Sequence, residues 1–277
     1  MGINPWYVLF SECRTSNSKN HLRCSIRTST KYSYSMDVVT SDYHCALLQA
    51  VMNRGAVNSA DRIMHLFSEK PESTQSYMYD INIELDDCDM MIKQVTCEIT
   101  GQKYWILITT LLDNGARFQT EFSPAQLELM RKILSAIITS DDGSVPSTLC
   151  LNLCSRLESK MSKADAEDFL ESMVQKMWLA RKSGQFYMGV RSIAELIPYF
   201  KATYNDQVFN MCALCRQTVF HGKRCTHCNE VLHLLCYVTC ARVQSSPKCP
   251  SCSNIMTVED MDGKKSYSII LLSINFI

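Results

Sequence analysis

The sequence has 277 residues, an apolar fraction of 46% and a formal net charge of zero. This length suffices for two or three small domains. A net charge of zero excludes a global field that would draw the whole chain onto nucleic acid or an anionic membrane. No run reaches the roughly 18–20 apolar residues that a membrane helix needs, so we expect no membrane contact.

The chain contains 15 cysteines, and eight of them lie between Cys212 and Cys252. An odd total argues against a framework of disulfide bonds. The apolar stretch 6–10 is too short for a secretory signal peptide and has no basic flank before it. We therefore expect a reducing compartment, either the cytosol or the nucleus.

The first 37 residues are rich in Ser, Thr, Lys and Arg and show no apolar periodicity. Such a composition buries too little apolar surface to offset the entropy of folding. We predict that residues 1–37 form a disordered extension.

Helical periodicity begins at Ser41, where Ser can cap a helix, and a second helix is predicted from Ser59. A third helix is predicted over residues 74–85. The apolar period then changes to two over residues 91–108, with Thr100-Gly101-Gln102 as the turn of a hairpin. Short helices followed by a hairpin are typical of a winged helix, which we predict over residues 38–121.

The same order repeats over residues 122–204, which predicts a second winged helix. Ser123 followed by Pro124 indicates a helix start, with Pro at the first helical position. Further helices are predicted at 147–157, 162–176 and 190–200, and a hairpin at 177–188.

Four pairs of metal-ligating residues follow within 41 residues, each with two residues between its members. A single such pair is a weak signal, but four together are a strong one. Zinc takes four ligands at a closed structural site, so eight ligands predict two structural zinc ions. The pairs are Cys212/Cys215, Cys225/Cys228, His233/Cys236 and Cys249/Cys252.

The gaps between the pairs favour an interleaved arrangement, or cross-brace, over two sites in series. Only four residues separate Cys228 from His233, whereas nine and twelve residues separate the outer pairs from this middle unit. We therefore assign the first and third pairs to the first zinc, and the second and fourth pairs to the second zinc. The overall prediction is an α+β chain with tandem winged helices and a cross-brace zinc finger at residues 208–256, the zinc module.

Two further candidate ligands lie near the pairs and are interpreted as bystanders. Cys240 follows Cys236 by one helical turn, and His227 lies inside the second pair. With eight ligands already present for two ions, we predict that neither binds zinc and that no open catalytic position remains. The tail, residues 257–277, is β-prone and has no predicted function.

Seven cysteines with a histidine in fifth place resemble the variant RING finger and also the PHD finger. PHD fingers usually carry Trp two residues before the seventh ligand, where this chain has Pro247. RING fingers favour Cys-Pro-x-Cys as the last pair and an aliphatic residue before the second ligand. Pro250 and Leu214 fit both features, so the module is more similar to a RING finger.

The wider pattern resembles the non-SMC element 1 family, the RING-bearing subunits of the DNA-repair complex built on the fifth and sixth structural-maintenance-of-chromosomes (SMC) proteins. The segments that carry the resemblance are Ser144–Cys154, Met177–Tyr187 and Cys212–Cys252. The resemblance implies a nuclear, chromatin-associated subunit that docks a MAGE-type partner through its winged helices. It also implies a RING-type ubiquitin ligase that acts with a ubiquitin-conjugating enzyme (E2).

The resemblance implies that Leu214 and Pro250 contact the E2. Many active RING fingers carry a basic residue directly after the last ligand, where this chain has Ser253. We therefore expect ligase activity to depend on a partner.

Two other functions remain open from the sequence. The zinc module can serve assembly alone in a non-catalytic interaction subunit. A winged helix can also bind DNA, but the predicted recognition helices carry acidic residues that repel phosphate, so DNA contact is expected to be mainly indirect. These residues are Asp80, Glu84, Asp165, Glu167, Asp168 and Glu171.

Overall fold

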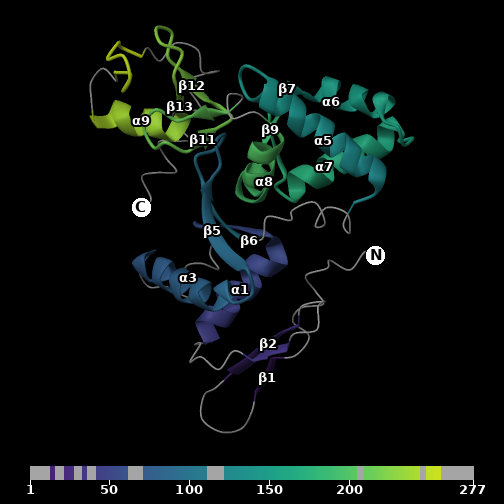
Figure 1. Ribbon diagram of the computed structural model, residues 1–277, viewed down its shortest axis with the longest axis vertical. Helices are drawn as coiled ribbons and strands as arrows, with labels where there is room; N and C mark the ends of the chain where they lie inside the picture. Colours follow the sequence, from purple (N-terminus) through teal and green to yellow (C-terminus); the bar gives the residue numbers. More distant parts are fainter. Residues whose placement is uncertain are drawn as a thin grey trace. The chain divides into compact units, whose positions relative to one another are not determined.

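The computed structural model describes residues 13–15, 22–27, 33–35, 42–61, 71–110, 122–204, 209–243 and 248–256. The chain divides into two compact units (Figure 1). The first unit contains residues 1–95 and 104–127, and the second contains residues 96–103 and 128–277. Within the described residues, no helix has the length and apolar character required to cross a membrane.

Three short strands lie within the segment that we predicted to be disordered. They are β1 (Cys13–Thr15), β2 (Leu22–Arg27) and β3 (Ser33–Ser35), and they form an antiparallel sheet in the order β1-β2-β3. The three strands pair through their backbones, and the disordered extension stays a prediction for the other residues of this segment. The rest of the predicted extension lies outside the described residues, as does the tail at 257–277.

The first unit continues with helices and a three-stranded sheet. The helices are α1 (Asp42–Arg54) and α3 (Pro71–Asp86), and the strands are β4 (Ala56–Asn58), β5 (Met90–Thr96) and β6 (Lys103–Thr109). The sheet order is β4-β6-β5. The predicted first and third helices and the hairpin are confirmed, whereas most of the predicted second helix lies outside the described residues.

Strand β4 was missed because it has only three residues and follows directly after a helix. Its central residue Val57 is fully buried and pairs with Trp105 of β6. Both residues belong to the apolar core that α1 and α3 cover. Tertiary burial thus makes a strand from a segment too short to show periodicity.

The second unit repeats this order. Its helices are α5 (Pro124–Thr139), whose residues 124–127 are counted with the first unit, α6 (Ser147–Leu153), α7 (Lys163–Gln175) and α8 (Val190–Thr203), with a 3₁₀ turn, η2, at Cys154–Arg156. Its strands are β7 (Ser144–Pro146), β8 (Leu179–Lys182) and β9 (Gln185–Met188), in the order β7-β9-β8. The predicted elements are present, and β7 is again a three-residue strand that the sequence did not indicate.

Local signals explain where these helices begin. The Ser123 hydroxyl accepts a hydrogen bond from the Gln126 N–H at 3.3 Å, and the Gln126 side chain accepts one from the Ser123 N–H at 2.9 Å. This reciprocal pair is a capping box. Ser162 caps α7 in a similar way by accepting from the Asp165 N–H at 3.0 Å.

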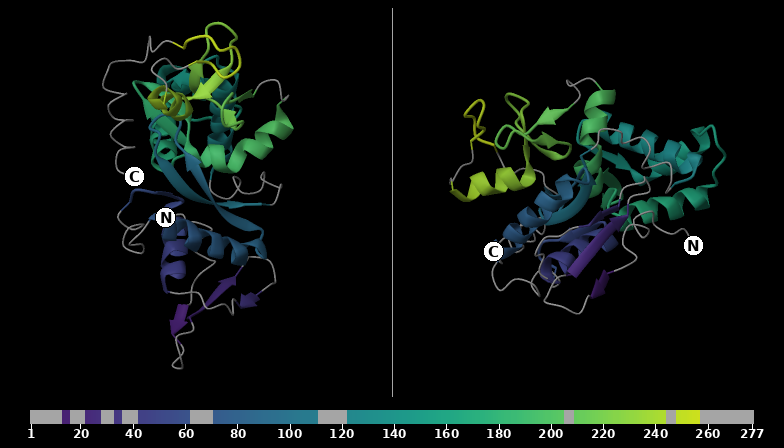
Figure 2. Two further views of the ribbon diagram at one scale, coloured as in Figure 1. Left: turned by 90° about the vertical axis from the view of Figure 1, so that its left-hand side faces the viewer. Right: turned by 60° about the horizontal axis from the view of Figure 1, so that its bottom comes forward.

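The zinc module follows with four short strands and one helix. They are β10 (Asn210–Met211), β11 (Thr218–Val219), β12 (Gly222–Arg224), β13 (Val231–His233) and α9 (Leu234–Val243). Figure 2 shows α9 running beside the β12–β13 hairpin. The described elements establish a mixed helix and sheet fold, and the winged-helix classification of the two preceding regions stays a prediction.

The zinc module packs against the loop between α5 and β7 within the second unit. The Asp142 carbonyl oxygen accepts a hydrogen bond from His221 Nδ1 at 2.7 Å. The His221 and Tyr187 rings pack edge to face, with their centroids 4.8 Å apart. Next in the loop, Gly143 has φ +70°, and a Cβ there would lie 1.9 Å from the Phe220 carbonyl oxygen. Only glycine fits both this conformation and this close approach.

A pair of Gly→Ala substitutions separates these two constraints. Gly184, in the β8–β9 turn, has φ +74°, and a Cβ added there would meet no atom within 4 Å. We expect Gly184→Ala to lower the free energy of unfolding by only about 1–2 kcal/mol, the cost of the left-handed conformation. Gly143→Ala should lower it further, because the Phe220 backbone must move away. Urea unfolding measures both variants, and equal losses would contradict the packing described.

Candidate metal centre

Two clusters of four side chains bring together all eight residues that the spacing predicted. The potential ligand atoms of each cluster lie within 4.8 Å of one another. The first cluster contains Cys212, Cys215, His233 and Cys236, and the second contains Cys225, Cys228, Cys249 and Cys252. The first pair thus joins the third and the second joins the fourth, which is the interleaving expected of a cross-brace.

The atom separations fit a tetrahedral ion. Zinc–sulfur bonds of about 2.3 Å place neighbouring sulfurs of a tetrahedron about 3.8 Å apart. The Sγ atoms of Cys225 and Cys252 are 3.7 Å apart, and those of Cys228 and Cys249 are 3.6 Å apart. A disulfide would require about 2.05 Å. The second cluster therefore has the dimensions of a four-sulfur zinc site, and both clusters could each hold a zinc ion.

Three of the pairs lie on turns of the same construction. In each turn the backbone N–H of the first cysteine donates to a carbonyl five residues later, and a residue directly after the second cysteine has a left-handed φ. The left-handed residues are Arg216 (φ 59°), Asn229 (φ 64°) and Ser253 (φ 60°). This backbone geometry points both sulfurs of a pair to the same side.

Backbone and amide donors favour the ionised form of two of the thiols. Burial raises the pKa of Cys212, but hydrogen bonds from the backbone at Cys215, His233 and Leu214 outweigh burial and lower it to about 6. The backbone and side chain of Asn254 lower the pKa of Cys252 to about 6. One thiol of each cluster therefore favours the thiolate, which is the form that binds a metal.

Hydrogen bonds fix the orientation of the imidazole of the first cluster. His233 Nδ1 lies 3.3 Å from Cys215 Sγ and 3.9 Å from Cys236 Sγ. On the other side of the ring, Nε2 lies 3.1 Å from the Thr218 carbonyl oxygen, which can only accept. Nε2 therefore carries the proton, and the Nδ1 lone pair faces the sulfurs, as a metal ligand requires.

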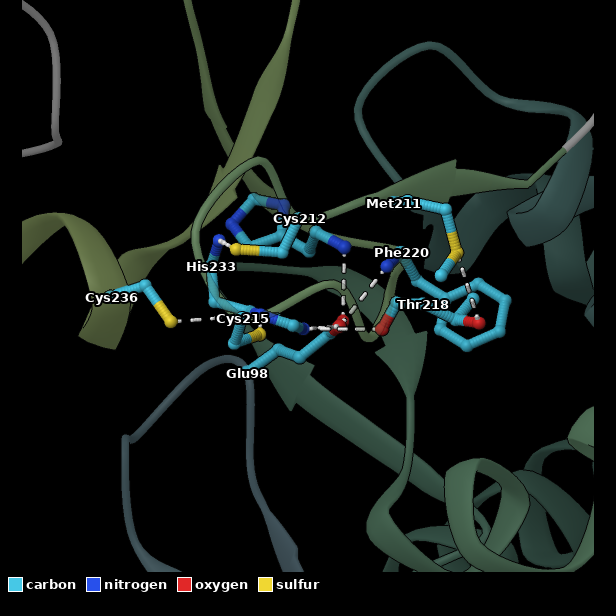
Figure 3. Close-up of polar contacts among 9 residues, drawn as sticks. Glu98, Met211, Cys212, Cys215, Thr218, Phe220, His233 and Cys236 are labelled. Carbon is cyan, nitrogen blue, oxygen red and sulfur yellow. Dashed lines mark hydrogen bonds and ion pairs between the residues drawn. The ribbon is translucent and has the colours of Figure 1, made fainter. Parts of the chain in front are cut away.

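A carboxylate that the sequence did not indicate lies against the first cluster. Glu98, between β5 and β6, accepts hydrogen bonds from the backbone N–H groups of Phe220 at 3.0 Å and His221 at 2.9 Å. Its Oε1 lies 3.5 Å from His233 Nε2, and its side chain is only 5% exposed. Figure 3 shows the carboxylate pointing toward Phe220 and the His233 ring. A Glu at the end of an alternating strand carries no sequence signal for such a role.

The remaining predicted residues lie near the clusters but outside them. Leu214 is 44% exposed, and Pro250 is also exposed. Cys240 and His227 belong to neither cluster. The hydroxyl of Tyr237, a buried residue of α9, donates to the Met256 carbonyl oxygen at 3.0 Å, which holds the chain after the last pair against the helix.

The fold and the two clusters define a protein with a RING-like double-zinc module. A family model described as "RING-like domain" matches residues 212–252, and one described as "Nse1 non-SMC component of SMC5-6 complex" matches residues 44–152. The similarity to whole proteins is broader than either match.

Known relatives cover most of the chain. The non-structural maintenance of chromosomes element 1 homolog of Bos taurus is 32% identical over 78% of this chain and 84% of its own length. The human homolog is 30% identical with the same coverage. A chain in the solved structure of an "Nse1-Nse3-Nse4 complex" matches with a TM-score of 0.68 and 30% identity, over 81% of this chain and 100% of the matched chain. The protein therefore belongs to the Nse1 family of non-SMC components of the SMC5-6 complex.

Zinc content tests the two clusters directly. We expect the full chain to purify with two zinc ions and Cys228→Ser with at most one, because the second cluster loses a ligand. Cys240→Ser, a cysteine in the same module outside both clusters, should retain two. Elemental analysis of the purified proteins gives the counts. Two zinc ions in Cys228→Ser, or fewer than two in Cys240→Ser, would contradict the assignment.

Proposed function

We propose that this chain is the RING-type ubiquitin-ligase subunit of an SMC5-6 complex. Its eight clustered residues hold two structural zinc ions, and the surface that they shape recruits an E2. The observation that carries the proposal is the interleaved pairing of the two clusters, which is the arrangement of a RING finger. Family membership supplies the complex in which the activity operates.

The zinc ions in this proposal have a structural role. Each cluster supplies four donors, which complete a tetrahedron and leave no position for water or substrate. The chain would therefore contribute no nucleophile or Lewis acid to ubiquitin transfer. Its contribution is to bind the E2 and bring it to a substrate, so that the chemistry takes place on the E2.

Leu214 and Pro250 are the candidate E2 contacts. Each lies between the two cysteines of a pair, Leu214 in the first cluster and Pro250 in the second. A Leu that served loop packing would be buried, whereas Leu214 is 44% exposed. Exposed apolar side chains held on rigid turns are suited to a partner surface.

Family membership supports a protein partner, and the surface charge of two helices argues against direct DNA binding. The related solved structure is that of an "Nse1-Nse3-Nse4 complex", and we infer that this chain likewise assembles with the MAGE-type subunit of its complex through the regions before the zinc module. The resulting location is the nucleus, on chromatin. On α3 and α7, exposed Asp80, Asp165, Glu167 and Asp168 disfavour direct contact with DNA phosphates.

A second candidate function is a non-catalytic subunit whose zinc module serves assembly alone. The observation that favours it is Ser253, the residue after the last ligand, where many active RING fingers place a basic side chain. In this case the E2 surface would have no effect on function, whereas loss of a zinc ligand would abolish assembly. In the ligase proposal, the partner compensates for the missing basic residue.

Substitution of Leu214 distinguishes the two functions. In a reconstituted complex with the MAGE-type subunit, Leu214→Ala should reduce E2-dependent ubiquitin-chain formation about 10-fold or more, because an apolar anchor is truncated. Ile255→Ala is the matched control, since Ile255 is 55% exposed in the zinc module but lies outside the four ligand pairs. Zinc content and co-purification should not change in either variant. If the unmodified complex forms no ubiquitin chains with any E2 tested, the ligase proposal is contradicted.

Substitution of Ser253 tests the partner dependence. In the absence of its partner, the Ser253→Arg protein should form ubiquitin chains faster than the unmodified protein, because the substitution restores a basic side chain after the last ligand. Arg216 has nearly the same left-handed φ, 59° against 60°, so this backbone position accepts Arg. Ser251→Arg, which adds the same charge two residues earlier on an exposed position, serves as the control. Equal rates for the two variants would refute the account of Ser253.

A further inference from the structure

We propose that Glu98 is a positioning residue for the first zinc ion, although it precedes the ligands by more than 100 residues. It lies on the tip between β5 and β6, residues 96–103, which belongs to the second unit with the zinc module. The inference rests on the proposed zinc ligands and is independent of ubiquitin transfer.

The burial of Glu98 requires an explanation. A carboxylate removed from water loses several kcal/mol of hydration unless hydrogen bonds and opposite charges replace it. Glu98 is 5% exposed at its side chain, and every partner that it contacts in the described structure belongs to the zinc module. Cys97 and Ile99 on either side are also buried. The zinc module therefore holds the tip through this carboxylate. Burial of the carboxylate costs hydration free energy that an uncharged residue at this turn would not lose.

The two carboxylate oxygens have separate tasks. Oε2 accepts from the His221 N–H at 2.9 Å, while Oε1 accepts from the Phe220 N–H at 3.0 Å and lies 3.5 Å from His233 Nε2. The two N–H groups belong to the turn directly after β11, which contains Thr218, the residue whose carbonyl accepts from His233 Nε2 at 3.1 Å. Glu98 thus acts on the imidazole twice, through its own oxygen and through the turn that supplies the second acceptor.

This arrangement is the carboxylate–histidine contact that tunes a metal ligand. An acceptor at Nε2 keeps the proton on that nitrogen, fixes the ring orientation and makes the Nδ1 lone pair a stronger donor to the metal. The second cluster contains no histidine and has no such carboxylate among the described contacts. The structure therefore assigns to Glu98 an effect on one of the two zinc ions only.

Release of zinc from the full chain tests this assignment. With a competing chromophoric chelator in excess, we expect Glu98→Ala to release one equivalent of zinc about 10–100-fold faster than the unmodified chain, and the other equivalent at the unmodified rate. Glu98→Gln keeps the size of the side chain but replaces one acceptor oxygen with a donor amide. The release rate of Glu98→Gln should lie between those of Glu98→Ala and the unmodified chain. This variant serves as the test if Glu98→Ala does not fold. The matched control is Glu230→Gln, an exposed glutamate of the zinc module, which should release both ions at the unmodified rate.

Cobalt substitution provides the readout that a purely structural role would not change. Co²⁺ bound by three sulfurs and one nitrogen absorbs differently from Co²⁺ bound by four sulfurs. In Glu98→Gln, the bands of the mixed site should shift or weaken while those of the four-sulfur site stay the same. Unchanged spectra with unmodified release rates, or equal weakening of both sites, would overturn the proposal. If the unmodified chain does not bind two zinc ions, the result would instead contradict the proposed assignment of the zinc ligands.

Discussion

The interleaved sharing of seven sulfurs and one imidazole between two clusters is the constraint on which the zinc module depends. The buried set of this module contains Cys212, Cys225 and Cys249 among few large apolar side chains. A segment of this size cannot bury enough apolar surface to fold on hydrophobic burial alone. Because each cluster joins pairs from distant positions, the two ions close overlapping loops. Metal binding and folding of this module are consequently a single equilibrium.

The same constraint explains how the module is fixed to the rest of its unit. The turn at Phe220 and His221 is held from two directions, by the Glu98 carboxylate and by the loop at Asp142 and Gly143. The contacts are mainly hydrogen bonds to backbone groups, which are directional and tolerate little displacement. The turn leads into β12, which pairs with β13 and so with His233. Docking of the module and shape of the first cluster therefore depend on the same few atoms.

The sequence was most informative where a single residue type has few alternative uses. Cysteine pairs with two intervening residues led to both clusters and their interleaving, and the helix caps at Ser123 and Ser162 located two helix starts. Strands β4 and β7 escaped prediction because three residues cannot show a period of two, and burial against distant partners decides their conformation. The strands within residues 13–35 were missed because β1 and β3 have only three residues each and the alternation in β2 is only six residues long.

Glu98 shows the limit of sequence reasoning in this chain most clearly. A Glu beside a turn is ordinarily exposed, and neither its neighbours nor its spacing to the ligands indicates a contact with Phe220 and His221. Only the tertiary structure brings these residues together across 122 and 123 positions. The acidic residues of the predicted recognition helices can be read from the sequence, but a buried charge with distant partners cannot.

The cross-brace itself is tested most directly by NMR of the chain loaded with spin-half cadmium, in which each metal resonance couples to the protons of its own ligands. The account predicts that the resonance coupled to the His233 ring also couples to the β-protons of Cys212, Cys215 and Cys236. The other resonance should couple to the remaining four cysteines. Coupling of the His233 metal to Cys249 and Cys252 would show two sites in series and would contradict the account.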